Sequence, residues 1–246
     1  MKAYLAITLI IACSVGFAQT PVMKVTQTEM KSVARDSLVI CSTTFGRSGK
    51  AASTFVCLPM MGHTRDSFFP LKDSLTELSK RTDSVNFSLP TWRIFDMRGH
   101  GCSVKRGKAT LSWESMTETE FAKYPADIAD ALKGTSNLIL IGASIGANTA
   151  ALLTEEMPEI QRLILLSPGL NYRGLEPADA IMAFKGKILL VASSSDEYSY
   201  KSVREMASLN PDHCTLMIFD GDAHGTDIIN DNPAAMQALV DWLLKN

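Results

Sequence analysis

The chain has no long run of basic residues, and its formal net charge is −2 over 246 residues. Proteins that bind nucleic acid or an anionic membrane surface by charge usually carry a positive patch, so the charge pattern indicates neither partner. Aromatic residues make up only 7%, yet hydrophobic residues make up 46%, which is ordinary for a full globular core. The absence of internal repeats, low-complexity tracts and linkers favours a single domain.

Cysteine is scarce, and its spacing gives no sign of a metal or redox site. None of the five cysteines forms a C-x-x-C pair, so neither a zinc site nor a thioredoxin-like site is indicated. Asp96, His100 and His63 could supply ligands, but they do not have the spacing of a metal site. We therefore expect no metal and no cofactor.

The N-terminus is typical of a targeting segment. Met1-Lys2 is a short basic start, residues 3–13 are mostly apolar, and small residues at 16–18 have the spacing of a cleavage site. We expect residues 1–18 to be a signal peptide and the mature chain to be secreted or periplasmic. A lipoprotein signal with lipid on Cys13, or a buried N-terminal strand, are the alternatives. The apolar run is too short to span a bilayer. Export permits disulfides, but the spacing does not give their pairing.

Strand-like and helix-like segments alternate from residue 53 to the C-terminus. Short apolar or β-branched runs predict strands at 53–58, 92–95, 138–141, 162–166, 187–192 and 214–219. Helical spacing and start signals predict helices at 66–80, from 117 to 133 with Pro125 interrupting or restarting the helix, and at 147–153, 200–209 and 234–245. Residues 22–44 suggest early strands at a sheet edge, followed by a turn cluster at 45–50. This order predicts an α/β fold, with a mostly parallel central sheet flanked by helices on both faces, as one domain over 19–246.

A strand, a serine between glycines and a helix follow one another at residues 137–155. The segment Gly142-Ala143-Ser144-Ile145-Gly146 has the form G-x-S-x-G between the predicted strand and the predicted helix. That context is typical of a nucleophile elbow, in which a tight turn lifts the serine hydroxyl above the strand end. The helix N-terminus also offers N–H groups to an oxyanion. The alternative is a merely structural glycine-rich turn, because the five-residue pattern also arises by chance.

Two further candidate residues follow later strands. Asp196 comes after the strand at 187–192, and His224 comes after the last strand. Functional residues of an open parallel sheet gather at the carboxyl ends of its strands. A serine hydroxyl needs a base, and the base needs an acid that fixes its tautomer. We therefore interpret Ser144, His224 and Asp196 as candidate nucleophile, base and acid.

Each partner of the serine has an alternative interpretation. Asp196 could cap the helix that begins near Tyr198, and Asp220 or Asp222 could then be the acid. His224 could be a loop histidine bonded to backbone. The remaining histidines lie before a strand or in earlier loops (His213, His63, His100).

With the order serine, acid, histidine, the chain from Ser53 onward resembles a serine esterase of the α/β-hydrolase superfamily, of a lidless, secreted bacterial type. The matching segments are 96–101 (D-M-R-G-H-G), 142–146, Ser195-Asp196 and Ala223-His224-Gly225. The resemblance implies an α/β-hydrolase fold and an acyl-enzyme mechanism without cofactors. Segment 96–101 is structural in that family, so we assign no chemistry to Asp96 or His100.

The expected oxyanion hole departs from the family pattern. The family usually has His-Gly after its third strand, and the next residue donates its backbone N–H. Here Pro59-Met60 stands in those places, which makes Met61 one donor and Ile145, after the serine, the other. Backbone donors do not depend on the side chain, so the hole can survive. The alternative is that Met60 and Met61 merely pack against the sheet.

The resemblance also bears on the substrate. Relatives with a lid insert it after the strand that is here 162–166, and the short segment 170–187 resembles lidless members with an open site. We expect a small-molecule ester or an acylated partner rather than a lipid interface. Several apolar residues could line the pocket, although core packing is the simpler interpretation for most of them (Met60, Met61, Phe68, Leu170, Tyr172).

Two classes of function stay open at this point. The first is hydrolysis of carboxylic esters, with thioesterase, peptidase and lactone-hydrolase activities compatible with the same residues. The second is a non-catalytic binding protein on a hydrolase scaffold, which the missing His-Gly favours and the three triad candidates oppose.

Overall fold

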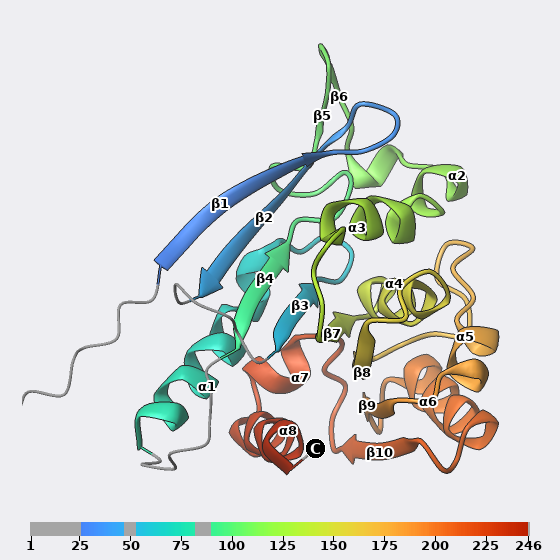
Figure 1. Ribbon diagram of the computed structural model, residues 1–246. Coiled ribbons are helices and arrows are strands. Elements are labelled where there is room, and N and C mark those ends of the chain that lie inside the picture. The colour runs from blue at the N-terminus through green and yellow to red at the C-terminus, as the bar shows by residue number, and fades with distance from the viewer. Residues whose placement is uncertain (1–25, 47–52, 82–89, 246) are drawn as a thin grey trace, which may run out of the picture.

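The computed structural model describes residues 26–46, 53–81 and 90–245. The predicted signal peptide and Cys13 lie outside the described residues. An eight-stranded sheet has the order β1-β2-β4-β3-β7-β8-β9-β10, and β5 and β6 form a separate two-stranded sheet (Figure 1). The strands are β1 (Thr26–Val33), β2 (Val39–Gly46), β3 (Thr54–Leu58), β4 (Thr91–Phe95), β5 (Lys105–Arg106), β6 (Ala109–Thr110), β7 (Leu138–Ala143), β8 (Ile160–Leu166), β9 (Lys187–Ser193) and β10 (Cys214–Phe219).

The strand directions confirm the predicted mostly parallel sheet. β4, β3, β7, β8, β9 and β10 run parallel to one another, whereas β1 and β2 pair antiparallel at one edge. The turn cluster predicted from Phe45 begins too early, because β2 runs through Gly46. Phe45 pairs with Trp92 of β4, and its ring packs edge-on against Phe69. Sheet pairing and aromatic packing thus outweigh the turn signal of Gly46.

Helices cover both faces of the sheet, as predicted. In Figure 1, α1, α7 and α8 lie on one side, and α3, α4, α5 and α6 lie on the other. The helices are α1 (Phe69–Arg81), α2 (Glu118–Phe121), α3 (Tyr124–Leu132), α4 (Ile145–Leu152), α5 (Ala178–Ala183), α6 (Glu197–Leu209), α7 (Asp227–Asn230) and α8 (Pro233–Lys245), with 3-10 turns η1 (Arg65–Phe68), η2 (Trp113–Ser115) and η3 (Leu153–Glu155).

Alternate residues of the central strands face two separate hydrophobic cores. In β7, Leu138 and Leu140 pack with α3 to α6, whereas Ile139 and Ile141 pack with α1, α7 and α8. All four side chains are fully buried. A strand covered on both faces must be apolar at every position, which explains why the sequence shows continuous rather than alternating apolar runs. The two cores fix the sheet, and therefore fix where its strand ends meet.

The helix predicted from Thr117 begins there, but its predicted capping box does not form. Thr117 is the N-cap of α2 without a side-chain cap hydrogen bond. The Glu120 carboxylate accepts from Arg98, Arg106 and Lys123 instead. Pro125 lies in the first turn of α3, so the helix restarts rather than continues.

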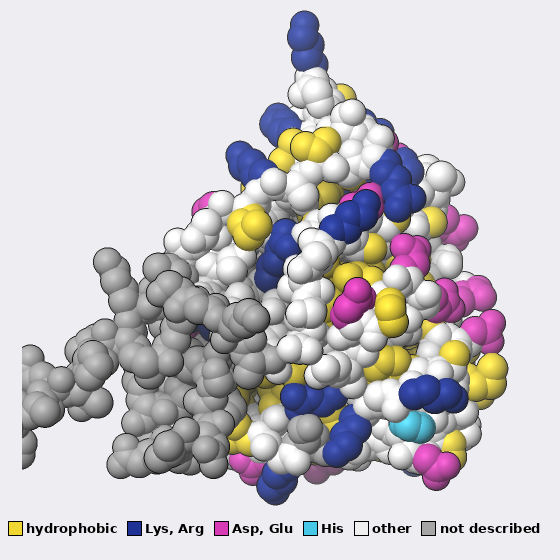
Figure 2. All heavy atoms as spheres, in the orientation of Figure 1, with side chains coloured by type: hydrophobic (Ala, Val, Ile, Leu, Met, Phe, Trp, Pro, Cys, Tyr) yellow, Lys and Arg dark blue, Asp and Glu magenta, His cyan; other side chains and the backbone are white. Residues whose placement is uncertain are grey.

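The surface carries both signs of charge. On the face in Figure 2, acidic and basic side chains are interspersed over most of the surface, and several basic ones lie towards the tip that holds β5 and β6. No helix within the described residues is long and apolar enough to cross a membrane.

Candidate active site

The turn between β7 and α4 has the geometry of a nucleophile elbow. Ser144 is the N-cap of α4, with φ 52° and ψ −121°, a conformation that costs a non-glycine residue on the order of 1–3 kcal/mol. A Cβ at Gly142 would clash with backbone atoms of Gly146 and Ala147, and a Cβ at Gly146 would clash with the carbonyl oxygens of Leu58 and Pro59. Both glycines are therefore needed for close backbone approach. The turn thus has the structural role expected of a glycine-rich turn, and the backbone of Ser144 within it is strained.

Ser144 directly follows the carboxyl end of the central strand β7, and its hydroxyl lies beside Tyr172. Its backbone N–H donates to Leu166 O at 2.7 Å, and the residue is only 7% exposed. Burial raises the pKa of Tyr172, and interactions of its hydroxyl with the side chains of Ser199 and Ser144 oppose that rise. The phenol of Tyr172 thus stays neutral near pH 7 and forms part of the wall around the serine.

Asp196 and His224 form a close pair. The Nδ1 atom of His224 lies 2.6 Å from Oδ2 of Asp196. Asp196 is also the N-cap of α6, where its Oδ1 accepts the backbone N–H of Ser199 at 3.4 Å. The cap of α6 and the contact with His224 therefore coexist, because one carboxylate oxygen contacts the helix and the other contacts the histidine. An acid that accepts from Nδ1–H leaves Nε2 unprotonated and free to act as a base.

The other candidate acids do not pair with His224. Asp220 and Asp222 line a depression of about 360 Å³ between the end of β10 and the start of α8, and neither is hydrogen-bonded to the histidine within the described part of the chain. No group of three or more His, Cys, Asp or Glu side chains that could hold a metal occurs among the described residues.

Two serines at strand ends hold the loop that carries His224. Ser193, the last residue of β9, donates its hydroxyl to Ala223 O at 2.6 Å. Ser167, just after β8, accepts the backbone N–H of Gly225 at 2.9 Å. The residues on either side of the histidine are thus fixed to neighbouring strands. The sequence singled out neither serine, because their hydrogen-bond partners lie 30 and 58 residues away in the chain.

The histidine loop lies against the elbow. A Cβ at Gly225 would be 3.4 Å from Cβ of Ala143, the residue before Ser144. The ring of His224 meets the ring of Tyr172 edge-on, with centroids 6.3 Å apart. No direct hydrogen bond joins Ser144 to His224 among the described residues. Tyr172, named from the sequence only as a pocket candidate, lies beside both.

The loop after β3 lies against the first turn of α4. The carbonyl oxygens of Leu58 and Pro59 approach Gly146 so closely that no side chain fits there. This contact places the start of the loop, at Leu58 and Pro59, against the first turn of α4. Met60 is 6% exposed and packs with the core on the α1 side, and Met61 packs against the other core. The packing expected of both methionine side chains is therefore present.

Of the other pocket candidates, Phe68 is fully buried in the core. Leu170 is partly buried against the core on the α4 side. Residues 167–186, between β8 and β9, contain only the short helix α5, so no large cap is inserted between these two strands.

A comparison with protein-family models finds one match, described as "Serine aminopeptidase, S33", over residues 91–225. That segment is more than half of the chain and includes the elbow, Asp196 and His224. The chain belongs to this family. The family has the α/β-hydrolase fold, which the strand order and the flanking helices also show, so the protein is an α/β hydrolase. No curated protein sequence matches the chain.

Solved structures share the fold at low sequence identity. A predicted CIB-like hydrolase from Thermoplasma acidophilum aligns with a TM-score of 0.67 and 16% identity, covering 91% of this chain and 100% of the other. An esterase from Pyrococcus furiosus aligns with a TM-score of 0.64 and 15% identity, covering 90% and 91%. An esterase from Exiguobacterium antarcticum aligns with a TM-score of 0.64 and 12% identity, covering 87% and 99%. The likeness spans nearly the whole chain.

Proposed function

We propose that this α/β hydrolase is a serine esterase that cleaves carboxylic esters through an acyl-enzyme. The observation that carries the proposal is the 2.6 Å contact between His224 Nδ1 and Asp196 Oδ2, beside a strained serine at a helix N-terminus. A strained elbow has a structural cost, and a partly buried carboxylate that contacts a histidine fixes the tautomer of its ring. Both features have a purpose if the serine is a nucleophile.

The proposed reaction follows from these positions. Ser144 Oγ rotates towards His224 Nε2 as substrate binds; catalytic hydrogen bonds of unliganded enzymes are often long and tighten in the substrate complex. His224 takes the hydroxyl proton while Oγ attacks the ester carbonyl, and Asp196 stabilises the imidazolium. The backbone N–H groups of Met61 and Ile145 bind the oxyanion. His224 then protonates the leaving alcohol, and water hydrolyses the acyl-enzyme by the same steps.

A single substitution tests the nucleophile. Ser144→Ala is expected to abolish hydrolysis of p-nitrophenyl acetate and covalent labelling by a fluorophosphonate. Ser195→Ala, which alters an exposed serine at the same sheet edge, is the matched control and should keep both. If Ser144→Ala retains hydrolysis, the assignment is wrong. If the wild-type protein neither hydrolyses the ester nor reacts with the fluorophosphonate, a non-catalytic binding protein replaces the esterase.

Ester substrates are proposed ahead of peptides. Two of the structural neighbours are esterases, whereas the family model carries the name of an aminopeptidase. The small segment between β8 and β9 leaves the site open to small esters. Comparing kcat/KM for p-nitrophenyl acetate, a thioester of the same acyl group and alanine p-nitroanilide ranks the three chemistries, and a higher value for the anilide would favour the peptidase.

We also propose that the protein works outside the cytoplasm. Residues 1–18 have the pattern of a signal peptide, and Cys41 forms a disulfide with Cys102. Disulfides persist in oxidising compartments and are rare in the cytosol. Mass spectrometry of the mature protein should give Gln19 as its first residue. A lipid-modified Cys13 would make it an anchored lipoprotein, and an intact Met1 would contradict export.

A further inference from the structure

The loop that carries the proposed oxyanion donor Met61 is held by the turn after β4. The backbone N–H of Gly62 donates to Nε2 of His100 at 2.9 Å. Three residues further on, the N–H of Arg65 donates to Oδ1 of Asp96 at 2.9 Å. Within the loop, the N–H of His63 donates to Met60 O at 3.2 Å. The Met60–Met61 peptide, which contains the Met61 N–H, is therefore held through its carbonyl oxygen by a hydrogen bond within the loop. The next peptide, Met61–Gly62, is held by the side chain of His100, which lies outside the loop.

The ring of His100 is fixed in one orientation and one tautomer. Its Nδ1 lies 3.1 Å from Arg98 O. Because Nε2 accepts from Gly62, Nδ1 must carry the proton and the imidazole is neutral. The ring stacks on Trp113 at 5.7 Å between centroids and 10° between planes, and the residue is only 4% exposed. Burial lowers the pKa of His100, which keeps Nε2 available as an acceptor.

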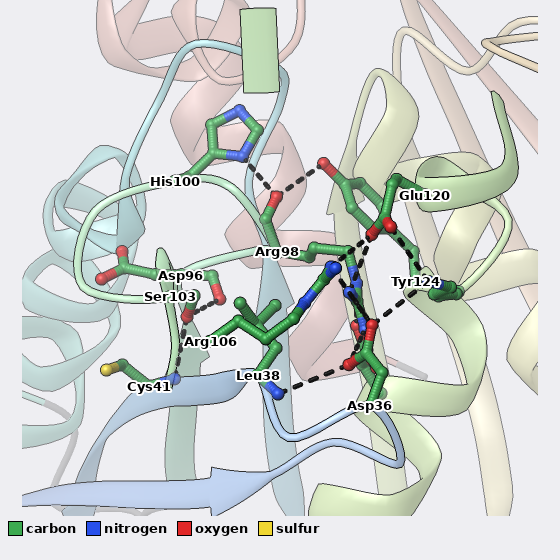
Figure 3. Close-up of polar contacts among 12 residues, drawn as sticks. Asp36, Leu38, Cys41, Asp96, Arg98, His100, Ser103, Arg106, Glu120 and Tyr124 are labelled. Atoms are coloured by element: carbon green, nitrogen blue, oxygen red, sulfur yellow. Dashed lines mark hydrogen bonds and ion pairs between the residues drawn. The ribbon is translucent and has the colours of Figure 1, made fainter. Parts of the chain in front are cut away.

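Arg98, which accepts from His100, is itself immobilised. Its fully buried guanidinium forms an ion pair with Asp127 at 2.7 Å. It also pairs with Asp36 at 2.8 Å and Glu120 at 2.9 Å (Figure 3). In Figure 3 the contacts from the His100 ring and the Tyr124 hydroxyl converge on the Arg98 carbonyl. The carbonyl that orients the His100 ring therefore belongs to a residue anchored at both its backbone and its side chain.

We propose that His100 is a positioning residue for the oxyanion hole, acting through its hydrogen bond to the N–H of Gly62. It touches neither substrate nor Ser144; it sets the direction in which the Met61 N–H points. The pattern at 96–101 marks a structural turn, and the contact with Gly62 gives that turn a consequence for catalysis. The inference rests on the proposed esterase function of Ser144.

Two substitutions with the same functional group and different reach test the hydrogen bond. The amide of His100→Gln can place its oxygen near the position of Nε2, whereas the shorter His100→Asn reaches only towards Arg98 O. We expect His100→Asn to lower kcat for p-nitrophenyl acetate by about 10- to 100-fold with KM changed less than about twofold, because a misplaced donor fails in the transition state. His100→Gln should stay within about threefold of the wild type. The matched control is His213→Asn, at the other end of the sheet, where the ring contacts Gly186 O.

Counting reactive sites separates positioning from misfolding. Exhaustive fluorophosphonate labelling followed by mass spectrometry gives the fraction of molecules with a competent Ser144, and kcat is expressed per labelled site. If His100 had a purely structural role, His100→Asn would lower the fraction of molecules with a competent Ser144 and leave the rate per labelled site unchanged. Equal rates per site in His100→Asn and the wild type, or equal losses in the Asn and Gln variants, would overturn the inference while leaving the esterase intact. A wild-type protein that does not label would overturn the proposed function first.

Discussion

At the scale of single residues, the contact between Asp196 and His224 gives the sharpest expectation. An asparagine at position 196 can turn an N–H group toward the ring and thereby favour the tautomer that has its proton on Nε2, which is the wrong one for a base. Asp196→Asn should therefore lower kcat for p-nitrophenyl acetate by roughly 10⁴-fold, as in the serine protease precedent. The measurement is kcat per labelled Ser144, with circular dichroism to confirm the fold.

Asp222→Asn is the matched control for this prediction. Asp222 lies two residues from His224 in the chain and lines the depression next to the start of α8, but it is not hydrogen-bonded to the ring within the described structure. Its substitution should change kcat less than about threefold. A large loss in Asp222→Asn together with a small loss in Asp196→Asn would reverse the assignment of the acid.

The residues that the sequence indicated as site candidates are those with a local signature. Ser144 stands in a G-x-S-x-G pattern, and His224 and Asp196 directly follow apolar strands, so parallel pairing alone gathers them at one edge. Tyr172, Ser167 and Ser193 have no such signature. Their contacts join segments that are 27 or more residues apart, and such contacts become visible only after the sheet is assembled.

At the scale of elements, long apolar segments were predicted well and short ones were not. The strands from β3 to β10 in the main sheet, and the helices α1, α6 and α8, match the predicted ranges within a few residues. The hairpin of β5 and β6 and the helices α5 and α7 were missed, because two to six residues carry too little periodicity. Tertiary contacts hold the two short helices, because Ile181 of α5 and Ile228 of α7 are buried in the two cores.

The disulfide between β2 and the turn after β4 gives an expectation at the same scale. Cys41 and Cys102 are 61 residues apart in the chain, and closing a loop of that length restricts the unfolded state by about 4 kcal/mol in the chain-entropy model. The double substitution Cys41→Ala and Cys102→Ala should therefore lower the free energy of unfolding by about that amount. Urea denaturation of the oxidised wild type and the double variant measures the difference.

The two other described cysteines provide the control for the disulfide. Cys57 and Cys214 are free thiols, and burial raises the pKa of both, that of Cys214 to about 11. The side chain of Cys214 is half-buried, so Cys214→Ala should change the free energy of unfolding by less than about 1 kcal/mol. A double variant at Cys41 and Cys102 that is no less stable than Cys214→Ala would show that the disulfide does not constrain the unfolded chain.

At the scale of the whole molecule, the carboxylates around Arg98 and on the sheet edge make stability depend on pH. Hydrogen bonds from Arg98 lower the pKa of Asp36, a hydrogen bond from Arg35 lowers that of Asp130, and a hydrogen bond from Thr43 lowers that of Glu29. Burial raises the pKa of Asp127, despite its ion pair with Arg98. Burial would raise the pKa of Glu120, but a hydrogen bond from Lys123 and the nearby positive charges together outweigh that effect and lower it. Four groups thus favour the folded state when ionised, and one opposes them.

The sign of the pH effect follows from proton binding. Where a folded-state pKa lies below the ordinary value, the unfolded chain binds more protons, so stability rises with pH. The contributions of Asp36, Glu120, Asp130 and Glu29 are complete above their ordinary pKa values of about 4 and are lost as the pH falls further. Asp127 acts in the opposite direction, but it is one group against four. Tm should therefore fall steadily between about pH 5 and pH 3.

Asp36→Asn tests which carboxylate matters most for this acid sensitivity. Asp36 joins Arg98, Arg106 and Lys123, so its removal should lower Tm at pH 7 and flatten the decline of Tm between pH 5 and pH 3. Asp212→Asn, which changes an exposed aspartate before β10, should leave both the value at pH 7 and the slope as in the wild type. Scanning calorimetry at half-unit pH intervals resolves the slopes. A slope in Asp36→Asn as steep as that of the wild type would show that the other carboxylates with a lowered pKa (Glu120, Asp130 and Glu29) cause the acid sensitivity.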